Sequence, residues 1–182
     1  MKFHKILTTT ILAIGLVFSH YSHASDDDYF YLGLALGGAK TSDDSIFQEK
    51  EQSASYLRLG FIAVGWIGLE YGSFGMVEPV NEDKTPPVTS ETEVAGSTSL
   101  IMIRSSLADR AWLHIGAGSI DYQITVDGTE AYSGTGEAYS LGLDWLFGDN
   151  WSLRYEVAKY TKIGPAEADI THTRLGLTYN FF

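Results

Sequence analysis

The chain has 182 residues, a formal net charge of −11 and no cysteine. The length suits one domain, and the lack of cysteine excludes disulfide bonds and thiolate chemistry. An acidic balance of this size argues against a surface that follows nucleic-acid phosphates, so we expect no nucleic-acid partner.

The first 24 residues have the anatomy of a secretory signal peptide. Two lysines precede an apolar run from Ile6 to Phe18, and Ser22 and Ala24 occupy the −3 and −1 positions of a small-residue cleavage site. The apolar run is shorter than the roughly 20 residues of a membrane-spanning helix. We therefore expect export and cleavage after Ala24, which leaves residues 25–182 as one mature domain.

Bulky apolar residues alternate with small or charged residues along the mature chain, which is typical of strands. The alternating runs predict eight strands, near residues 30–37, 56–63, 67–72, 97–106, 113–118, 139–145, 153–158 and 173–182. In each run one face is bulky and apolar, whereas the other holds glycine, small residues and charges. No further apolar run approaches helix-spanning length, so a membrane location requires a closed barrel.

Residue size predicts which face of the strands points outward. Eight strands enclose a lumen that side chains just fill. Glycine, small residues and a few paired charges fit that space, whereas rows of Leu, Phe and Trp do not. The sequence predicts an all-β, eight-stranded, antiparallel up-and-down transmembrane β-barrel with its apolar face in lipid. A soluble lipocalin-like ligand-binding barrel, with the faces reversed, is an alternative.

The connections and the tryptophans favour an outer-membrane barrel. The connections after the odd-numbered strands are expected to be long (Thr41–Ser53, Gly75–Glu93, the Asp127-Gly128 region and Thr161–Asp169), and those after the even-numbered strands short. All four tryptophans lie close to the short turns, which predicts an aromatic girdle at the periplasmic interface. The expected girdle comprises Trp66, Trp112, Trp145, Trp151, Tyr179, Phe181 and Phe182.

Four stretches carry a family resemblance: "FYLGLALGGA", "IGLEYGSFG", "GLDWLFGDNWSLRYEVAKY" and the C-terminal "LGLTYNFF". With them, the chain resembles the small eight-stranded barrels of the OmpA transmembrane-domain, OmpX and Ail type. The ending Tyr179-Asn180-Phe181 matches the "YxF" terminus of such families, and Phe182 is one extra residue. The resemblance covers Tyr29 to Phe182 and implies the bacterial outer membrane, but its motifs specify the function poorly.

Charged residues on the expected inner face form the first candidate site. Unpaired charges in a narrow lumen would be costly, so these side chains should form one hydrogen-bonded ion-pair network. We favour a polar plug that fixes strand register, and a gated pore or small solute channel is the alternative. The expected lumen polar network comprises Arg58, Glu70, Arg104, His114, Asp144, Arg154, Glu156 and Arg174.

An enzymatic role is not expected. A lipid-modifying barrel enzyme of the lipid A deacylase kind needs a nucleophile and a base side by side near the outer rim. His172 lies near that rim with Thr171 and Thr173 beside it and Asp169 nearby, but the His-x-Ser-Asn arrangement of that family is missing. The acidic loops show no calcium-loop spacing. We expect no catalytic residue, no cofactor and no metal site.

The fifth expected strand supplies a candidate surface site. It runs from about Ala111 to Val126, longer than the roughly 9–11 residues that cross a bilayer, and it ends at Asp127-Gly128, a strong hairpin signal. The excess should project as a ribbon above the membrane, and its exposed edge could bind partners by strand addition. The ribbon residues are Ile120, Tyr122, Ile124 and Val126.

The expected function follows from the ribbon and the acidic loops. The resemblance to OmpX and Ail implies that such a ribbon is linked to adhesion. We expect a monomeric outer-membrane protein with a structural or adhesion-like role through its acidic extracellular loops. Its expected partners are outer-membrane lipid, lipopolysaccharide and an unidentified surface protein.

Overall fold

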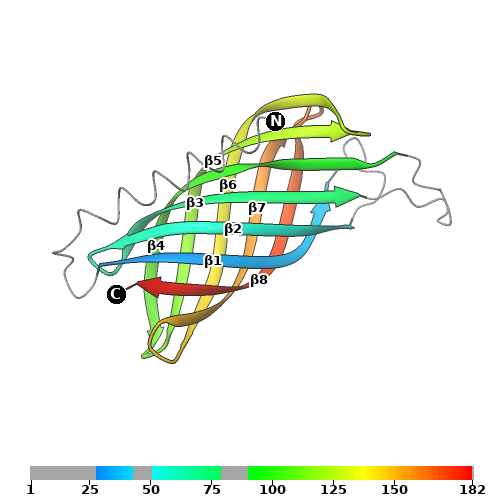
Figure 1. The fold of residues 1–182 in the computed structure, drawn as a ribbon. Coiled ribbons are helices and arrows are strands. Elements are labelled where there is room, and N and C mark those ends of the chain that lie inside the picture. The colour runs from blue at the N-terminus through cyan, green and yellow to red at the C-terminus, as the bar shows by residue number, and fades with distance from the viewer. Residues whose placement is uncertain (1–27, 43–50, 79–89, 182) are drawn as a thin grey trace.

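Eight antiparallel strands close into one barrel in the computed structural model (Figure 1), which describes residues 28–42, 51–78 and 90–181. Each strand pairs with its neighbour in sequence, and β1 pairs with β8 to close the ring. The predicted fold class is therefore confirmed. The strands are β1 Tyr29–Thr41, β2 Glu51–Ala63, β3 Ile67–Glu78, β4 Thr92–Ala108, β5 Ala111–Val126, β6 Thr129–Phe147, β7 Trp151–Ile163 and β8 Ala168–Phe181.

Some predicted features lie outside the described residues. These are the signal peptide, the acidic parts of the first two long loops, and Phe182. Among the described residues, no helix is long and apolar enough to cross a membrane.

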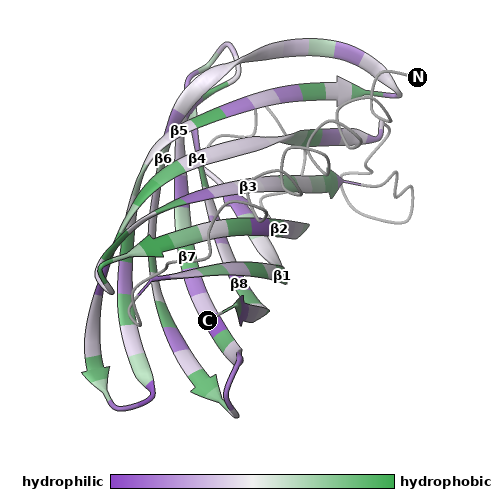
Figure 2. Ribbon diagram, turned by 60° about the vertical axis from the view of Figure 1, so that its left-hand side comes forward, coloured by the Kyte–Doolittle hydropathy of each residue, from purple (hydrophilic) through white to green (hydrophobic). Residues whose placement is uncertain are grey.

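The outer face of the barrel is apolar. On β1, Tyr31 and Ala35 are buried inside, whereas Leu34 and Leu36 are 66% and 73% exposed. Buried and exposed residues alternate over part of every strand, and Figure 2 shows repeated changes between hydrophilic and hydrophobic colour along the strands. Contiguous apolar surface of this extent is unfavourable in water and suits a lipid environment. The soluble lipocalin-like alternative, with its apolar face inward, is therefore wrong.

Glycines on the inner face make room for aromatic rings from the neighbouring strand. A Cβ atom added at Gly60 on β2 would overlap the ring of Tyr31 on β1, and one added at Gly72 on β3 would overlap Tyr56 on β2. Only glycine, which has no side chain, allows a ring to lie flat against the backbone there. These two pairs place the hydroxyl groups of Tyr31 and Tyr56 inside the lumen.

The interior has two layers, and the second was not predicted. Charged side chains fill the half near the short turns, as described below. The half near the long connections is packed with large apolar side chains, so the expectation that only small and charged residues face inward is wrong there. This apolar core includes Phe74, Met76, Val94, Ile120, Tyr122, Ile124, Tyr160, Ile163 and Ile170.

The strands β4, β5 and β6 are the longest in the barrel. The bounds of β5 are those predicted, and a two-residue turn at Asp127-Gly128 joins it to β6. Both turn residues have positive φ, 49° and 76°, as a type I′ hairpin turn requires. The connection after β5 is therefore a tight turn rather than the predicted long loop. The residues expected in the loop belong to strands β5 and β6 instead.

Candidate functional site

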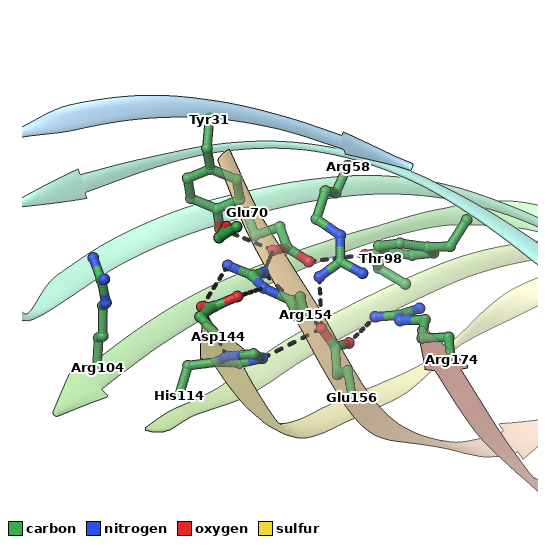
Figure 3. Close-up of polar contacts among 12 residues, drawn as sticks. Tyr31, Arg58, Glu70, Thr98, Arg104, His114, Asp144, Arg154, Glu156 and Arg174 are labelled. Carbon is green, nitrogen blue, oxygen red and sulfur yellow. Dashed lines mark hydrogen bonds and ion pairs between the residues drawn. The ribbon is translucent and has the colours of Figure 1, made fainter. Parts of the chain in front are cut away.

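Arg154 on β7 is the centre of the first part of the lumen polar network (Figure 3). Its Nε and Nη2 atoms donate to the two carboxylate oxygens of Asp144 on β6, at 2.5 and 3.0 Å, and its Nη1 atom donates to Glu70 Oε2 on β3 at 2.7 Å. All three side chains are buried. A bidentate arginine–carboxylate pair is among the strongest protein hydrogen-bond arrangements. Together with the bond to Glu70, it links strands β3, β6 and β7.

Glu156, two residues along β7, is the centre of the second part. Its Oε2 atom accepts a hydrogen bond from Arg58 Nη1 at 2.8 Å, and its Oε1 atom accepts one from Arg174. His114 joins both parts, because Nδ1 lies 3.3 Å from Asp144 Oδ2 and Nε2 lies 3.3 Å from Glu156 Oε2. The predicted residues other than Arg104 are thus brought together in one cluster.

Tyrosine hydroxyls complete the hydrogen bonding of this cluster. Tyr31 donates to Glu70 Oε2 at 2.8 Å, and Tyr56 donates to Glu70 Oε1 at 3.2 Å. Tyr160 accepts a hydrogen bond of 3.0 Å from Arg174, and Thr98 lies 2.7 Å from the Tyr56 hydroxyl. The prediction included none of these four residues in the network. Their inward position in the alternation was the available signal for Tyr31 and Tyr56.

The cluster balances its charges. Three arginines (Arg58, Arg154 and Arg174) face three carboxylates (Glu70, Asp144 and Glu156), all buried. A paired set of this kind avoids the large cost of isolated buried charge. Two ion pairs cross the lumen, from β2 and β3 to β7, and two more join β7 to its neighbours β6 and β8. The arrangement suits a plug that fixes the relative positions of the strands.

Arg104 lies apart from the cluster, as Figure 3 shows, on the part of β4 near the short turn to β5. It donates a hydrogen bond to the Tyr29 hydroxyl, and its guanidinium lies 4.0 Å from the centre of the Trp112 ring. Trp112 occupies the same face of β5 as His114, so it packs under a cation on the lumen side. The prediction that Trp112 belongs to the lipid-facing girdle is therefore wrong.

The other described girdle residues lie near the short turns. Trp66, Trp145, Trp151 and Phe181 are exposed on the outer side. Tyr179 packs edge-on against both Trp151 and Phe181, at 5.0 and 4.8 Å between ring centres. Amphipathic rings in this position suit a membrane–water interface.

Searches with the sequence alone find no relative, whereas structural comparison finds several. No protein-family model and no curated protein matches the sequence. Neisserial surface protein A (NspA) aligns with a TM-score of 0.66 at 10% identity over 87% of this chain and 100% of its own. Ail of Yersinia pestis, in complex with the heparin analogue sucrose octasulfate, gives 0.59 at 14% identity over 85% and 97%. OprG of Pseudomonas aeruginosa gives 0.53 at 15% identity over 87% and 97%.

The chain has the fold of the small eight-stranded outer-membrane barrels. The resemblance predicted from the sequence is confirmed at the level of the fold. An outer-membrane barrel fold with an apolar outer belt places the protein in the bacterial outer membrane, as predicted.

The expected ribbon of this outer-membrane barrel is present, but its side chains are not available to a partner. Ile120, Tyr122 and Ile124 are 1%, 5% and 6% exposed, and Val126 is half-buried. The backbone of β5 pairs with β4 and β6 along its whole length. The prediction that these four residues form an exposed binding edge is therefore wrong.

A free edge does exist on the adjacent strand. In the described part of the chain, β6 pairs with β7 only from Glu137 onward, whereas it pairs with β5 from Thr129 onward. Its stretch from Thr129 to Thr135 thus has one paired side and one unpaired side, and most of its side chains are exposed. We call residues 129–135 the β6 edge.

The outer-rim histidine does not form a catalytic arrangement. His172 faces the interior and is fully buried against Tyr160, whereas Thr171 and Thr173 lie on the opposite face of β8 and Asp169 binds Lys159 at 2.7 Å. A base would need a nucleophile within hydrogen-bond reach. Among the described residues, no group of His, Asp and Glu side chains could hold a metal ion.

Proposed function

We propose that the protein is a monomeric surface-interaction protein that binds extended segments of other proteins at the β6 edge. The supporting observation is the unpaired backbone of residues 129–135 in the described structure, on a hairpin that continues beyond β7. An unpaired strand edge offers a row of N–H and C=O groups to an added strand. The proposal assigns no catalytic step and no cofactor.

The apolar core makes the β6 edge a rigid platform. Tyr122 donates to the Lys162 carbonyl at 3.3 Å and accepts a hydrogen bond of 2.8 Å from the Gly164 N–H, so the hairpin is tied to the end of β7 from inside. The rings of Tyr122 and Tyr132 stack with centres 6.1 Å apart. A fixed edge loses less conformational freedom on binding than a mobile loop does.

The charge of this surface limits the class of partner. The exposed residues Glu93, Asp121 and Glu130 lie on or beside the hairpin, and the whole chain is acidic. Ail was crystallised with a heparin analogue, but an acidic surface opposes a sulfated polymer. We therefore propose a neutral or basic extended peptide segment as the partner and expect no binding of sucrose octasulfate.

Selection of peptides on the purified protein in lipid nanodiscs tests this function. Eight-residue peptides selected from a random library should protect the backbone amides of residues 129–135 from hydrogen exchange. The double variant Ser133→Lys and Thr135→Lys should abolish this protection, because lysines on an edge strand oppose strand addition. The matched control is Ser97→Lys, a half-buried outward position on β4, whose two sides are paired. Peptides that protect only other regions would refute the proposal.

A further inference from the structure

The β6 edge stays unpaired because β7 turns away from it. The last residue of β7 that pairs with β6 is Thr161, opposite Glu137. Beyond it, Lys162 and Gly164 have φ angles of 64° and 73°, and residues in the left-handed region interrupt an extended strand. The Tyr122 hydroxyl takes up the freed backbone groups, since it donates to the Lys162 carbonyl and accepts from the Gly164 N–H. A strand added to β6 would therefore occupy the place that β7 leaves.

The inner side of the β6 edge carries one aromatic ring, that of Tyr132. Strand register places Tyr132 opposite the buried Ile124. The ring of Tyr132 lies 6.1 Å from that of Tyr122, with 23° between the planes, yet 39% of Tyr132 is exposed. Gly134, the next inward residue, has no side chain, and the Tyr122 hydroxyl lies only 2.8 Å from where its Cβ would be. Tyr132 is thus the inward side chain that a partner can cover.

The outer side of the edge is polar. Ser133 and Thr135 lie on the opposite face from Tyr132 and are exposed. Glu130 accepts a hydrogen bond of 2.8 Å from the amide of Gln123 on β5. Because side chains of a strand alternate between the two faces of a sheet, an added strand meets an aromatic ring on one face and hydroxyl and carboxylate groups on the other. A slip of one residue would exchange the two sets of side chains.

We propose that a segment bound at the β6 edge places an aromatic side chain on the inner face against Tyr132, and polar or basic side chains on the outer face. This assignment rests on the function proposed above and names the kind of segment that the edge selects. Residues directly opposite each other on paired strands have Cβ atoms about 4.5–5.5 Å apart, which brings two rings within reach of stacked or edge-to-face contact. Backbone hydrogen bonds hold the segment, and Tyr132 determines which segments bind well.

Four eight-residue peptides test this selectivity by hydrogen exchange on the protein in lipid nanodiscs. The first alternates threonine with lysine and has phenylalanine in place of one central threonine. Alanine instead of the phenylalanine should raise the Kd for protection of residues 129–135 about tenfold, and leucine should raise it about threefold. The fourth peptide carries its phenylalanine in place of a lysine. It should bind no better than the alanine peptide, because an inward phenylalanine would then bring the lysines inward as well.

A variant of the protein locates the contact. Tyr132→Ala should reduce the tenfold preference for phenylalanine over alanine to about twofold, because the ring that the phenylalanine contacts is removed. The matched control is Tyr139→Ala, an exposed tyrosine on the part of β6 that is paired on both sides, and it should keep the tenfold preference. The peptide series on the unmodified protein keeps the test decisive if the Tyr132 variant folds poorly.

Failure of this selectivity is distinct from failure of the proposed function. Equal Kd values for the phenylalanine and alanine peptides, with residues 129–135 still protected, would overturn the aromatic contact and leave the edge as a site for strand addition. Equal values for phenylalanine and leucine would overturn the restriction to aromatic side chains. An unchanged preference in a folded Tyr132→Ala protein would overturn the role of Tyr132. Absence of protection by all four peptides would instead count against strand addition at the β6 edge itself.

Discussion

The two halves of the barrel interior are built by opposite rules. In the periplasmic half, three arginines and three carboxylates form a buried cluster around Arg154 and Glu156. In the extracellular half, Phe74, Met76 and Ile120 belong to an apolar core like that of a soluble protein. The same eight strands therefore enclose a charged interior in one half of the barrel and an apolar interior in the other.

Strand β5 shows why the two halves differ. Near the periplasm, His114 faces inward and Ile115 faces outward; near the tip, Ile120 faces inward and Asp121 faces outward. The backbone alternation continues without interruption, but the polarity of the two faces reverses. Lipid surrounds the lower part, whereas water surrounds the hairpin above it. The medium outside the barrel thus accounts for the kind of residue on the outer face at each height.

The largest expected effect comes from breaking the ionic half. Arg154→Met leaves Asp144 and Glu70 without their main cation, and removal of one partner from a buried ion pair costs about 3–5 kcal/mol. Urea unfolding in lipid vesicles should show this loss. Arg110→Met, at an exposed turn, should stay within about 0.5 kcal/mol of the wild type. Equal values for the two variants would mean that the cluster contributes little to stability.

Removal of side-chain volume from the apolar half should lower the free energy of unfolding. Ile120→Ala removes a fully buried side chain from the core and should cost about 2–4 kcal/mol in the same unfolding experiment. Asp121→Ala, the exposed neighbour, should change the free energy of unfolding by less than about 0.5 kcal/mol. A larger effect at Asp121 than at Ile120 would contradict the reversal of polarity along β5.

The contact between glycine and an aromatic ring gives a smaller effect. Gly60→Ala places a methyl group against the ring of Tyr31, which moves its hydroxyl away from Glu70, and overpacking of this kind costs about 1–3 kcal/mol. The control is Gly75→Ala, where the nearest atom to an added Cβ is Ser55 Oγ at 3.7 Å. Equal unfolding free energies for the two variants would show that the ring adjusts freely.

The smallest effect should come from a surface pair above the belt. Lys162 donates a hydrogen bond to Glu137, which lowers the pKa of that carboxyl below its ordinary value of 4.5. A lowered pKa stabilises the folded state above pH 4.5, and this contribution is lost as the pH falls through the folded-state pKa. In the variant Glu137→Gln, the free energy of unfolding should therefore fall slightly less steeply as the pH is lowered below 5. An unchanged slope would show that the pair adds nothing.

The barrel itself was predictable from the sequence because its signal is local. Alternation in stretches such as Leu32–Leu36 and Leu153–Val157 reports one face in lipid, and the Asp127-Gly128 turn reports a hairpin. The inward charges were predictable for the same reason. The lengths of the strands were less predictable. β3 and β4 extend beyond the predicted runs, because near their outer ends the apolar residues, such as Phe74, Met76 and Val94, are on the inner face rather than the outer face.

The errors concern contacts between neighbouring strands, which the alternation along a single strand does not report. Trp112 looks like a girdle residue by its distance from a turn, but the cation of Arg104 across the sheet holds it on the lumen side. The free edge on β6 depends on where β7 ends, because β7 is the other neighbour of β6. The alternation of Ile120 with Asp121 was visible in the sequence, and it could have indicated a core inside the hairpin rather than an exposed edge.

The seam between β1 and β8 has a consequence for the time course of folding. Every residue from Phe30 to Thr41 is paired with one between Phe181 and Ile170, so the two ends of the chain must meet before the ring exists. Contacts of such long sequence separation form slowly. The ion pairs of Arg58 on β2 with Glu156 on β7, and of Arg154 on β7 with Glu70 on β3, form only across the closed lumen. The buried charges therefore reach neutrality in the last step, which couples barrel closure to completion of the ionic cluster.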